Sequence, residues 1–250
     1  MAEQPTALDT AFAALATFDW GQDAKALQPI DEAVVACHGN AGQRTELEAR
    51  FTRLLSQPLS RAAVEYSCRK LCLIGTAACV PTLAPLLDQP EHSHMARYAL
   101  ERIAVTAAGD ALRKALGTVP DELEIGMIAS LAARRDGQSV PAIAGVLAAA
   151  SKADQTRLAV AAADALGQIQ TAAAVDALAA AASTEPAVAA AVVNARLAAA
   201  EGFLAAKQPA KARAIYQSLA AAVAGQPDAK SIELAATRGL LACAELTAAF

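Results

Sequence analysis

Hydrophobic residues recur along the middle of this chain with a phase that predicts pairs of short helices. A leucine is followed nine residues later by a valine in three segments: LCLIGTAACVPTLAPLL, LAARRDGQSVPAIAGVL and LGQIQTAAAVDALAAAA. Each segment reads as the end of one helix, a short turn and the start of the next helix. A looser fourth copy has glycine in place of the valine. The anchor leucines of the four copies, spaced 29, 31 and 35 residues apart, are Leu71, Leu100, Leu131 and Leu166.

This spacing predicts an α-solenoid, in which each helical hairpin buries its apolar face only against its neighbours. The fold class expected is therefore all-α, a right-handed α-α superhelix without a β-sheet. The predicted hairpins pair residues 43–55 with 59–74, 77–87 with 92–104, 108–117 with 121–134, and 138–149 with 154–169. Further helices are expected at 171–182, 186–206 and 229–247.

The expected organisation is one continuous domain with three parts. Residues 1–40 are predicted to form a helical cap, 41–185 the repeats and 186–250 the C-terminal helices. In the cap, Phe18 and Trp20 are available to close one end of the core. Pro85 falls one turn inside its helix and is expected to kink it.

The repeats resemble HEAT repeats, because a proline-bearing first helix follows each helix end in the pattern x-x-x-Val-Pro-x-Leu-x-x-Leu. The stretches SHMARYALERI (93–103), SLAARRD (130–136) and ADALGQI (163–169) are similar to a bacterial family of HEAT-repeat proteins. The later stretch NARLAAAEGFLAAKQPAKARAIYQSLAA (194–221) resembles a tetratricopeptide unit, although it lacks that family's early tryptophan. The resemblance implies an armadillo-type fold and protein binding, and it brings no catalytic residues.

Composition and charge narrow the choice of partner. Hydrophobic residues make up 55% of the chain, aromatic residues 4% and charged residues 18%, and the net charge is −4. A nucleic-acid surface needs clustered lysine and arginine and aromatic rings for stacking, so nucleic acid is disfavoured. No uninterrupted apolar run reaches about 18 residues, and no basic leader is visible. We therefore expect no membrane partner, no signal peptide and a cytoplasmic location. The low charged fraction suggests that another chain covers some apolar surface.

Five cysteines and three histidines offer the nearest approach to a metal site. Cys68 and Cys72 share a helix face, Cys79 follows, and His92 and His94 open a later helix. Structural zinc sites usually carry two close pairs of ligands, whereas these thiols stand among leucines, as buried free cysteines do. An odd number of cysteines also favours reduced thiols. No metal and no cofactor are expected.

Arginines on the second helix of each hairpin are the candidate contacts for a partner. If these helices line a groove, their polar side chains form a strip that would pair with carboxylates of a partner segment. The alternative is that the arginines pair with Glu101, Asp136 and helix carbonyls inside the stack. The candidate partner-binding residues are Arg69, Arg97, Glu101, Arg134 and Arg157.

The function expected from these features is that of a non-enzymatic scaffold or adaptor. Its partner would be another protein, or a second copy of the chain, bound along the concave face of the superhelix. No small-molecule substrate is evident. The alternative is an enzyme-associated module resembling HEAT-type chromophore lyases, which cradle a prosthetic group. That role needs several aromatic residues around a pocket, and the only tyrosines are Tyr66, Tyr98 and Tyr216.

The thiols provide a direct test of the expected absence of metal. Protein purified without a chelator should contain well below one zinc or iron per chain by elemental analysis, because the thiols are expected to pack as small apolar groups. Stoichiometric metal that is lost on Cys68→Ser would contradict this expectation.

Overall fold

The computed structural model describes residues 4–152, 155–225 and 229–248. The structure is 78% helical, and the described residues contain no strand, which confirms the all-α class. The chain divides into two compact units, residues 1–130 and 131–250. This division follows neither of the predicted boundaries, at 40/41 and 185/186, which separate kinds of repeat rather than compact units.

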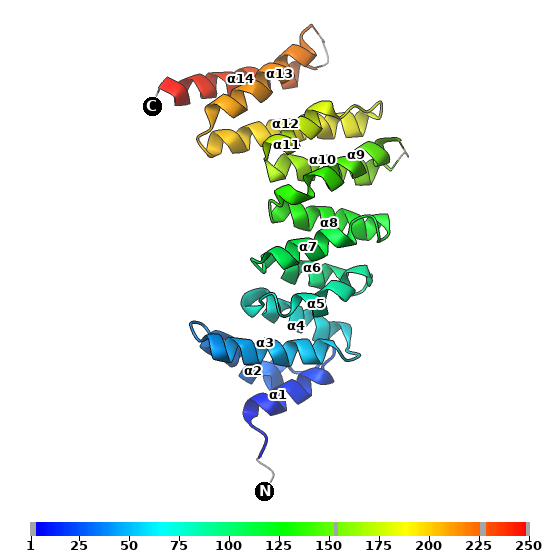
Figure 1. Ribbon diagram of the computed structural model, residues 1–250, viewed down its shortest axis with the longest axis vertical. Helices are drawn as coiled ribbons and strands as arrows, with labels where there is room; N and C mark the ends of the chain where they lie inside the picture. Colours follow the sequence, from blue (N-terminus) through cyan, green and yellow to red (C-terminus); the bar gives the residue numbers. More distant parts are fainter. Residues whose placement is uncertain (1–3, 153–154, 226–228, 249–250) are drawn as a thin grey trace. The chain divides into compact units, whose positions relative to one another are not determined.

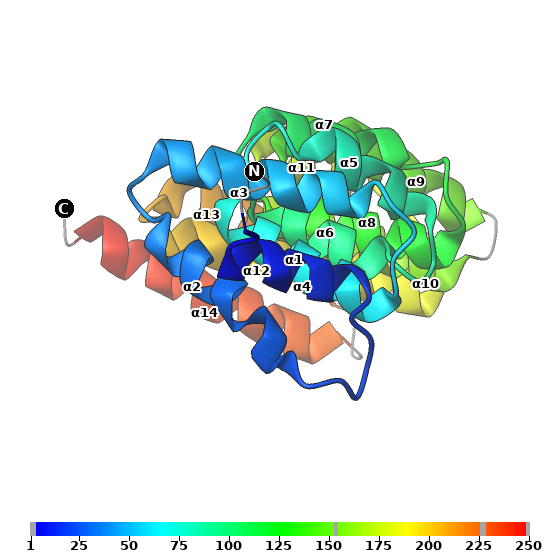
Figure 2. The same ribbon diagram turned by 90° about the horizontal axis from the view of Figure 1, so that it is seen from below.

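The first unit alternates helices between two sides. Figure 2 shows α3, α5 and α7 along one side, with α4 and α6 packed together beside them. The α-helices of this unit are α1 (Ala7–Ala16), α2 (Gln28–Ala36), α3 (Ala41–Leu55), α4 (Arg61–Ile74), α5 (Val80–Leu83), α6 (Ser93–Arg102), α7 (Thr106–Ala115) and all but the end of α8 (Asp121–Ala133). Two 3-10 turns, η1 (Ala24–Leu27) and η2 (Ala84–Asp88), complete it.

The second unit repeats the plan with longer helices. Figure 1 colours it from green to red, and α10 packs against α9 and α12, while α13 packs against α12 and α14. Its helices are η3 (Gly137–Ser139), α9 (Val140–Lys152), α10 (Thr156–Ile169), α11 (Ala172–Ala180), α12 (Pro186–Ala205), α13 (Pro209–Val223) and α14 (Lys230–Ala248). The helices of every predicted hairpin are therefore present, with ends within a few residues of those expected.

Local sequence signals account for the helix ends. Thr6, Asn40 and Ser60 each accept a backbone N–H with the side chain, which satisfies a donor that the first turn leaves free. The α-helix that contains Pro81 ends at Leu83 and continues as the 3-10 turn η2, because Pro85 has no N–H to donate. At Pro85, where a kink was expected, the structure has this change from α-helix to 3-10 turn.

The anchor leucines form the centre of each core. Leu71, Leu100, Leu131 and Leu166 are all 0% exposed. The residues twelve positions after them are also fully buried: Leu83, Leu112, Ile143 and Leu178. The repeat register read from the hydrophobic pattern is therefore confirmed on both helices of the hairpins.

A polar clamp joins two hairpins of the first unit. Arg44 donates from Nε to the carbonyl of Ile74 at 2.6 Å and from Nη2 to that of Gly75 at 2.9 Å, at the end of α4. One turn later on α3, the buried carboxylate of Glu48 accepts the N–H groups of Thr76 and Cys79 at 2.7 and 3.1 Å. Side chains of α3 thus satisfy both carbonyls and N–H groups of the turn that connects α4 to α5.

One cap residue lies elsewhere than the hydrophobic pattern suggests. Trp20 is 63% exposed, so the expectation that it closes the core is wrong. It lies in a turn, where its N–H donates to the side chain of Asp19 at 2.8 Å, a local bond typical of aspartate in turns. Phe18 is half-buried, and its carbonyl accepts a hydrogen bond from Ser60.

Helix α12 is long and apolar enough to cross a membrane by length and composition alone, with a mean hydropathy of 1.4. Val188, Val192 and Phe203 are nevertheless buried within the second unit, and the helix packs between α10 and α13. These are the contacts of a core helix in a folded domain. No other helix among the described residues has the same length and hydropathy.

Truncation of a central anchor should destabilise the first unit strongly. We expect Leu100→Ala to lower the free energy of unfolding by about 2–5 kcal/mol, since it removes buried methyl groups and leaves a cavity. Leu73 is 67% exposed and provides the control: Leu73→Ala should change stability by no more than about 0.5 kcal/mol. Urea unfolding measures both, and equal effects would show that the register is wrong.

Candidate binding site

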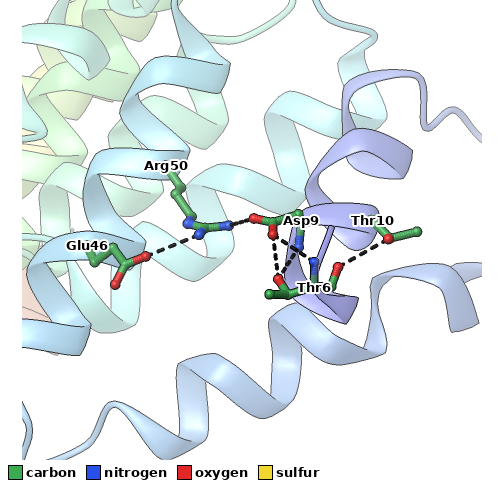
Figure 3. Close-up of polar contacts among 5 residues, drawn as sticks. All are labelled: Thr6, Asp9, Thr10, Glu46 and Arg50. Carbon is green, nitrogen blue, oxygen red and sulfur yellow. Dashed lines mark hydrogen bonds and ion pairs between the residues drawn. The ribbon is translucent and has the colours of Figure 1, made fainter. Parts of the chain in front are cut away.

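An arginine between α1 and α3 lies at the centre of a polar groove in the first unit. Arg50 of α3 binds Asp9 of α1 from Nη1 to Oδ1 at 2.6 Å, and Glu46, one turn earlier on α3, from Nη2 to Oε1 at 3.1 Å (Figure 3). Its guanidinium also lies 5.7 Å from the centre of the Phe12 ring, which stacks edge-on against Phe51. The guanidinium of Arg50 therefore pairs with two carboxylates and lies next to one aromatic ring.

Asp9 has a second task at the start of α1. Its side chain accepts from the backbone N–H of Thr6 at 2.9 Å and from the Thr6 hydroxyl, while the Asp9 N–H binds that hydroxyl in return. The hydrogen bonds from Thr6, with a further contribution from Arg50, lower the pKa of Asp9 to about 2. The pKa of Arg50 is raised, mainly by its hydrogen bond to Asp9. Both groups are therefore held in their charged forms.

Two cavities flank this ion pair. The larger, of about 470 Å³, lies between α1 and α3 and is lined on the apolar side by Phe12, Ala13, Ala16, Ala49 and Leu54. Arg53 and Gln57 provide further polar groups in the lining, and both are exposed. The smaller, of about 240 Å³, lies among α1, α2 and α3 and includes Cys37. The larger volume is in the range of ligand-binding clefts.

Arg53 differs from Arg50 in that the described residues offer it no ion pair or hydrogen bond. It lies in the last turn of α3, where a cation interacts favourably with the helix dipole. The groove between α1 and α3 thus combines a neutralised guanidinium, an exposed one and an apolar wall. Such a combination can bind a segment that carries both an apolar side chain and a carboxylate.

The structure places Arg97 and Glu101 of α6 against α8. Arg97 donates from Nη1 to the carbonyl of Gly126 at 3.1 Å, and the hydroxyl of Ser130 binds Glu101 at 3.2 Å. Burial lowers the pKa of Arg97, and its buried Nε has no hydrogen-bond partner. A Cβ at Gly126 would overlap this guanidinium, so glycine makes room for it. Both residues join α6 to α8.

The other predicted contacts are distributed over both units. Arg69 is exposed on α4 and pairs with Glu65 at 2.7 Å, one turn earlier. Arg134 is half-buried just after α8, and Arg157 is exposed on α10, both in the second unit. The structure brings Arg97 together with Glu101, through Ser130. The binding role of the five residues stays a prediction.

Two buried thiols of the first unit, those of Cys68 and Cys79, are protonated. Burial raises the pKa of Cys68 to about 12, and burial together with the nearby Glu48 raises that of Cys79 to about 12. A protonated thiol is a poor nucleophile and a poor metal ligand. Among the described residues, no group of three or more histidine, cysteine, aspartate or glutamate side chains could hold a metal ion.

Sequence reasoning passed over Asp9 and Arg50, although two signals point to them. Thr6 and Asp9 have the spacing of a capping box, and Glu46 and Arg50 have the i, i+4 spacing of a helical ion pair. Neither signal predicts that the two pairs meet across α1 and α3.

No protein-family model matches the chain, and no curated protein matches it either.

The depressed pKa of Asp9 makes the stability of the first unit depend on pH. The stabilising contribution of this carboxylate should be complete above its ordinary pKa of 3.8 and disappear as the pH falls through about 2, because the unfolded chain binds the proton more readily. The difference in urea midpoint between the natural chain and Asp9→Asn should therefore shrink between pH 5 and pH 2. Thr6→Ala should weaken this pH dependence more than Arg50→Gln does, and a difference independent of pH would contradict the assignment.

Proposed function

We propose that this chain is a non-enzymatic helical-repeat scaffold that binds a protein partner. The proposed architecture is an armadillo-type superhelix of HEAT-like repeats followed by TPR-like helices. Support comes from the equivalent burial of the anchor leucines in successive hairpins. Repeats of this kind stack to form extended surfaces on which partners bind. The proposed location is cytoplasmic.

The observation that carries the proposal is the groove between α1 and α3. Its apolar wall, which includes Phe12 and Leu54, would receive an aliphatic side chain of the partner. Arg53 would pair with a carboxylate beside that side chain, because its guanidinium is exposed and offers donors in a fixed fork. Arg50 is less suited to this role, since Asp9 and Glu46 already neutralise it. The partner segment proposed is therefore acidic and amphipathic.

The row of arginines on the second helices is a further proposed contact region. Arg69 is its best-placed member in the first unit, because its side chain is 59% exposed. Its i, i+4 pair with Glu65 is a surface ion pair, which contributes little to stability and can exchange for a partner's carboxylate. Arg97 is better explained by its bond to α8.

Two observations favour binding over the alternative, a cradle for a prosthetic group. The phenol of Tyr66 binds Asp31 at 2.7 Å, and that of Tyr216 is buried beside Glu201. Burial raises the pKa of Tyr216 to about 12, so this hydroxyl stays protonated. These phenols already have partners within the fold, and the thiols of Cys68 and Cys79 are held in their unreactive form.

Selection of short peptides against the full-length chain tests the proposal. We expect the recovered peptides to share an aliphatic residue near aspartate or glutamate. Arg53→Glu should weaken their binding by about tenfold or more, since it removes an ion pair and adds repulsion. Arg53→Gln should have an intermediate effect, and raising the salt concentration should weaken binding to the natural chain.

Two pairs of variants separate the groove from the rest of the surface. Ala49→Trp fills the groove and should abolish binding, whereas Ala179→Trp, on an exposed face of α11, should not. Lys114→Glu reverses an exposed basic residue of α7, outside both the groove and the second helices, and is the control for Arg53→Glu. Circular dichroism verifies that each variant is folded. Peptides that bind equally well to the Arg53 and Ala49 variants would refute the groove as the docking site.

A further inference from the structure

The last described helix presents an apolar stripe away from its own unit. On α14, Ala236, Gly239 and Cys243 are buried against the unit, and the ring of Tyr216 from α13 packs directly onto Gly239. On the opposite face, Leu234 is 59% exposed and Leu241 is 61% exposed. The two leucines are seven residues apart, so they lie on the same face two turns apart.

Charged residues flank these leucines along the same stripe. Lys230 precedes Leu234 by four residues, and Glu245 follows Leu241 by four. Both charged side chains are exposed, and neither of them forms an ion pair or a hydrogen bond with the described residues. The order along the stripe is therefore Lys230, Leu234, Leu241 and Glu245. The spacing between these residues is the same whichever end it is counted from.

We propose that this face of α14 binds a second copy of the chain in an antiparallel arrangement. A two-fold axis between positions 237 and 238 places Leu234 opposite Leu241 of the second copy, and in the same register it places Lys230 opposite Glu245 of the second copy. A single register thus satisfies both leucines and both charges. Thr237 and Arg238 are the two residues nearest to the axis, and the long, exposed side chain of Arg238 can extend from the contact into solvent.

The helix dipole provides a second reason for an antiparallel neighbour. Lys230 begins α14, where the dipole favours an acidic residue, and Glu245 lies in the last turn, where it favours a basic one. Both charges therefore have the unfavourable sign for their own helix. In an antiparallel pair, each would lie beside the opposite helix end and the opposite charge of the second copy, where its sign is favourable.

The contact is limited in size. A helix of 19 residues is about 28 Å long, so a pairing through α14 alone is expected at the small end of protein interfaces. The association is therefore a reversible equilibrium between monomer and dimer. Analytical ultracentrifugation or light scattering of the full-length chain over a wide concentration series should detect it.

Charge reversal provides the decisive experiment. Lys230→Glu places two like-charge pairs in the homodimer, as does Glu245→Lys, so each variant alone should dimerise about tenfold more weakly than the natural chain. A mixture of the two single variants should form a heterodimer readily, because each introduced charge then faces its opposite. The double variant Lys230→Glu with Glu245→Lys should dimerise again with the two pairs reversed.

These variants also exclude loss of folding as an explanation. Each single reversal improves the match between the charge and its own helix dipole, so helix content by circular dichroism should be maintained or rise slightly. Leu234→Ser with Leu241→Ser should abolish dimerisation, whereas Leu73→Ser, at an exposed leucine of the first unit, should leave it unchanged. This self-association is independent of the groove between α1 and α3, so variants of Arg53 should not affect it.

Three outcomes would overturn the proposal. The first is a chain that stays monomeric throughout the concentration series, including one in which this face binds a different protein. The second is a dimer that tolerates both single reversals. The third is a mixture of the single variants that fails to recover the association.

Discussion

The close approach of neighbouring helices is the constraint on which both units depend. In the second unit, a Cβ at Gly167 of α10 would lie only 2.7 Å from the carbonyl oxygen of Ala195 on α12. Only glycine permits that distance, and alanine on the facing helix keeps the seam narrow. Helices such as α10 gain most of their stability from such packing rather than from intrinsic helix propensity. The buried alanines thus allow this close approach, and the anchor leucines fill the volume that remains.

Tight stacking also determines what the charged residues do. When helices pack closely, their terminal carbonyl and N–H groups lose access to water and need partners from the protein. In the first unit, Arg44 and Glu48 of α3 are the partners of such groups in the turn after α4. Arg97 makes a similar bond to a carbonyl of α8. Charged side chains that look like surface residues in the sequence are therefore part of the scaffold.

The sequence predicts well the features that depend on periodicity. The anchors Leu71, Leu100, Leu131 and Leu166 face the core because spacing alone decides which side of a helix is buried. Periodicity does not predict the hydrogen-bond partner of a polar side chain, because that partner depends on which atom of the next hairpin lies opposite. Glu48 was missed as a connecting residue for this reason, whereas the bond of Arg97 to a helix carbonyl is the alternative that the sequence left open. The prediction that Trp20 closes the core is wrong for a different reason: the residue lies in a turn with a local bond to Asp19, and its ring is exposed.

Charges that the scaffold does not use are the most informative about partners, and they differ in weight. Arg53 lies in the last turn of α3, where the helix dipole by itself accounts for a basic residue. Its exposure therefore permits a binding role without requiring one. Lys230 and Glu245 have no such account, since each opposes the dipole of α14 and the described residues give it no ion pair. An unfavourable charge at each end of a leucine stripe is explained by a neighbour that reverses both signs, and an antiparallel second copy of the same helix does so.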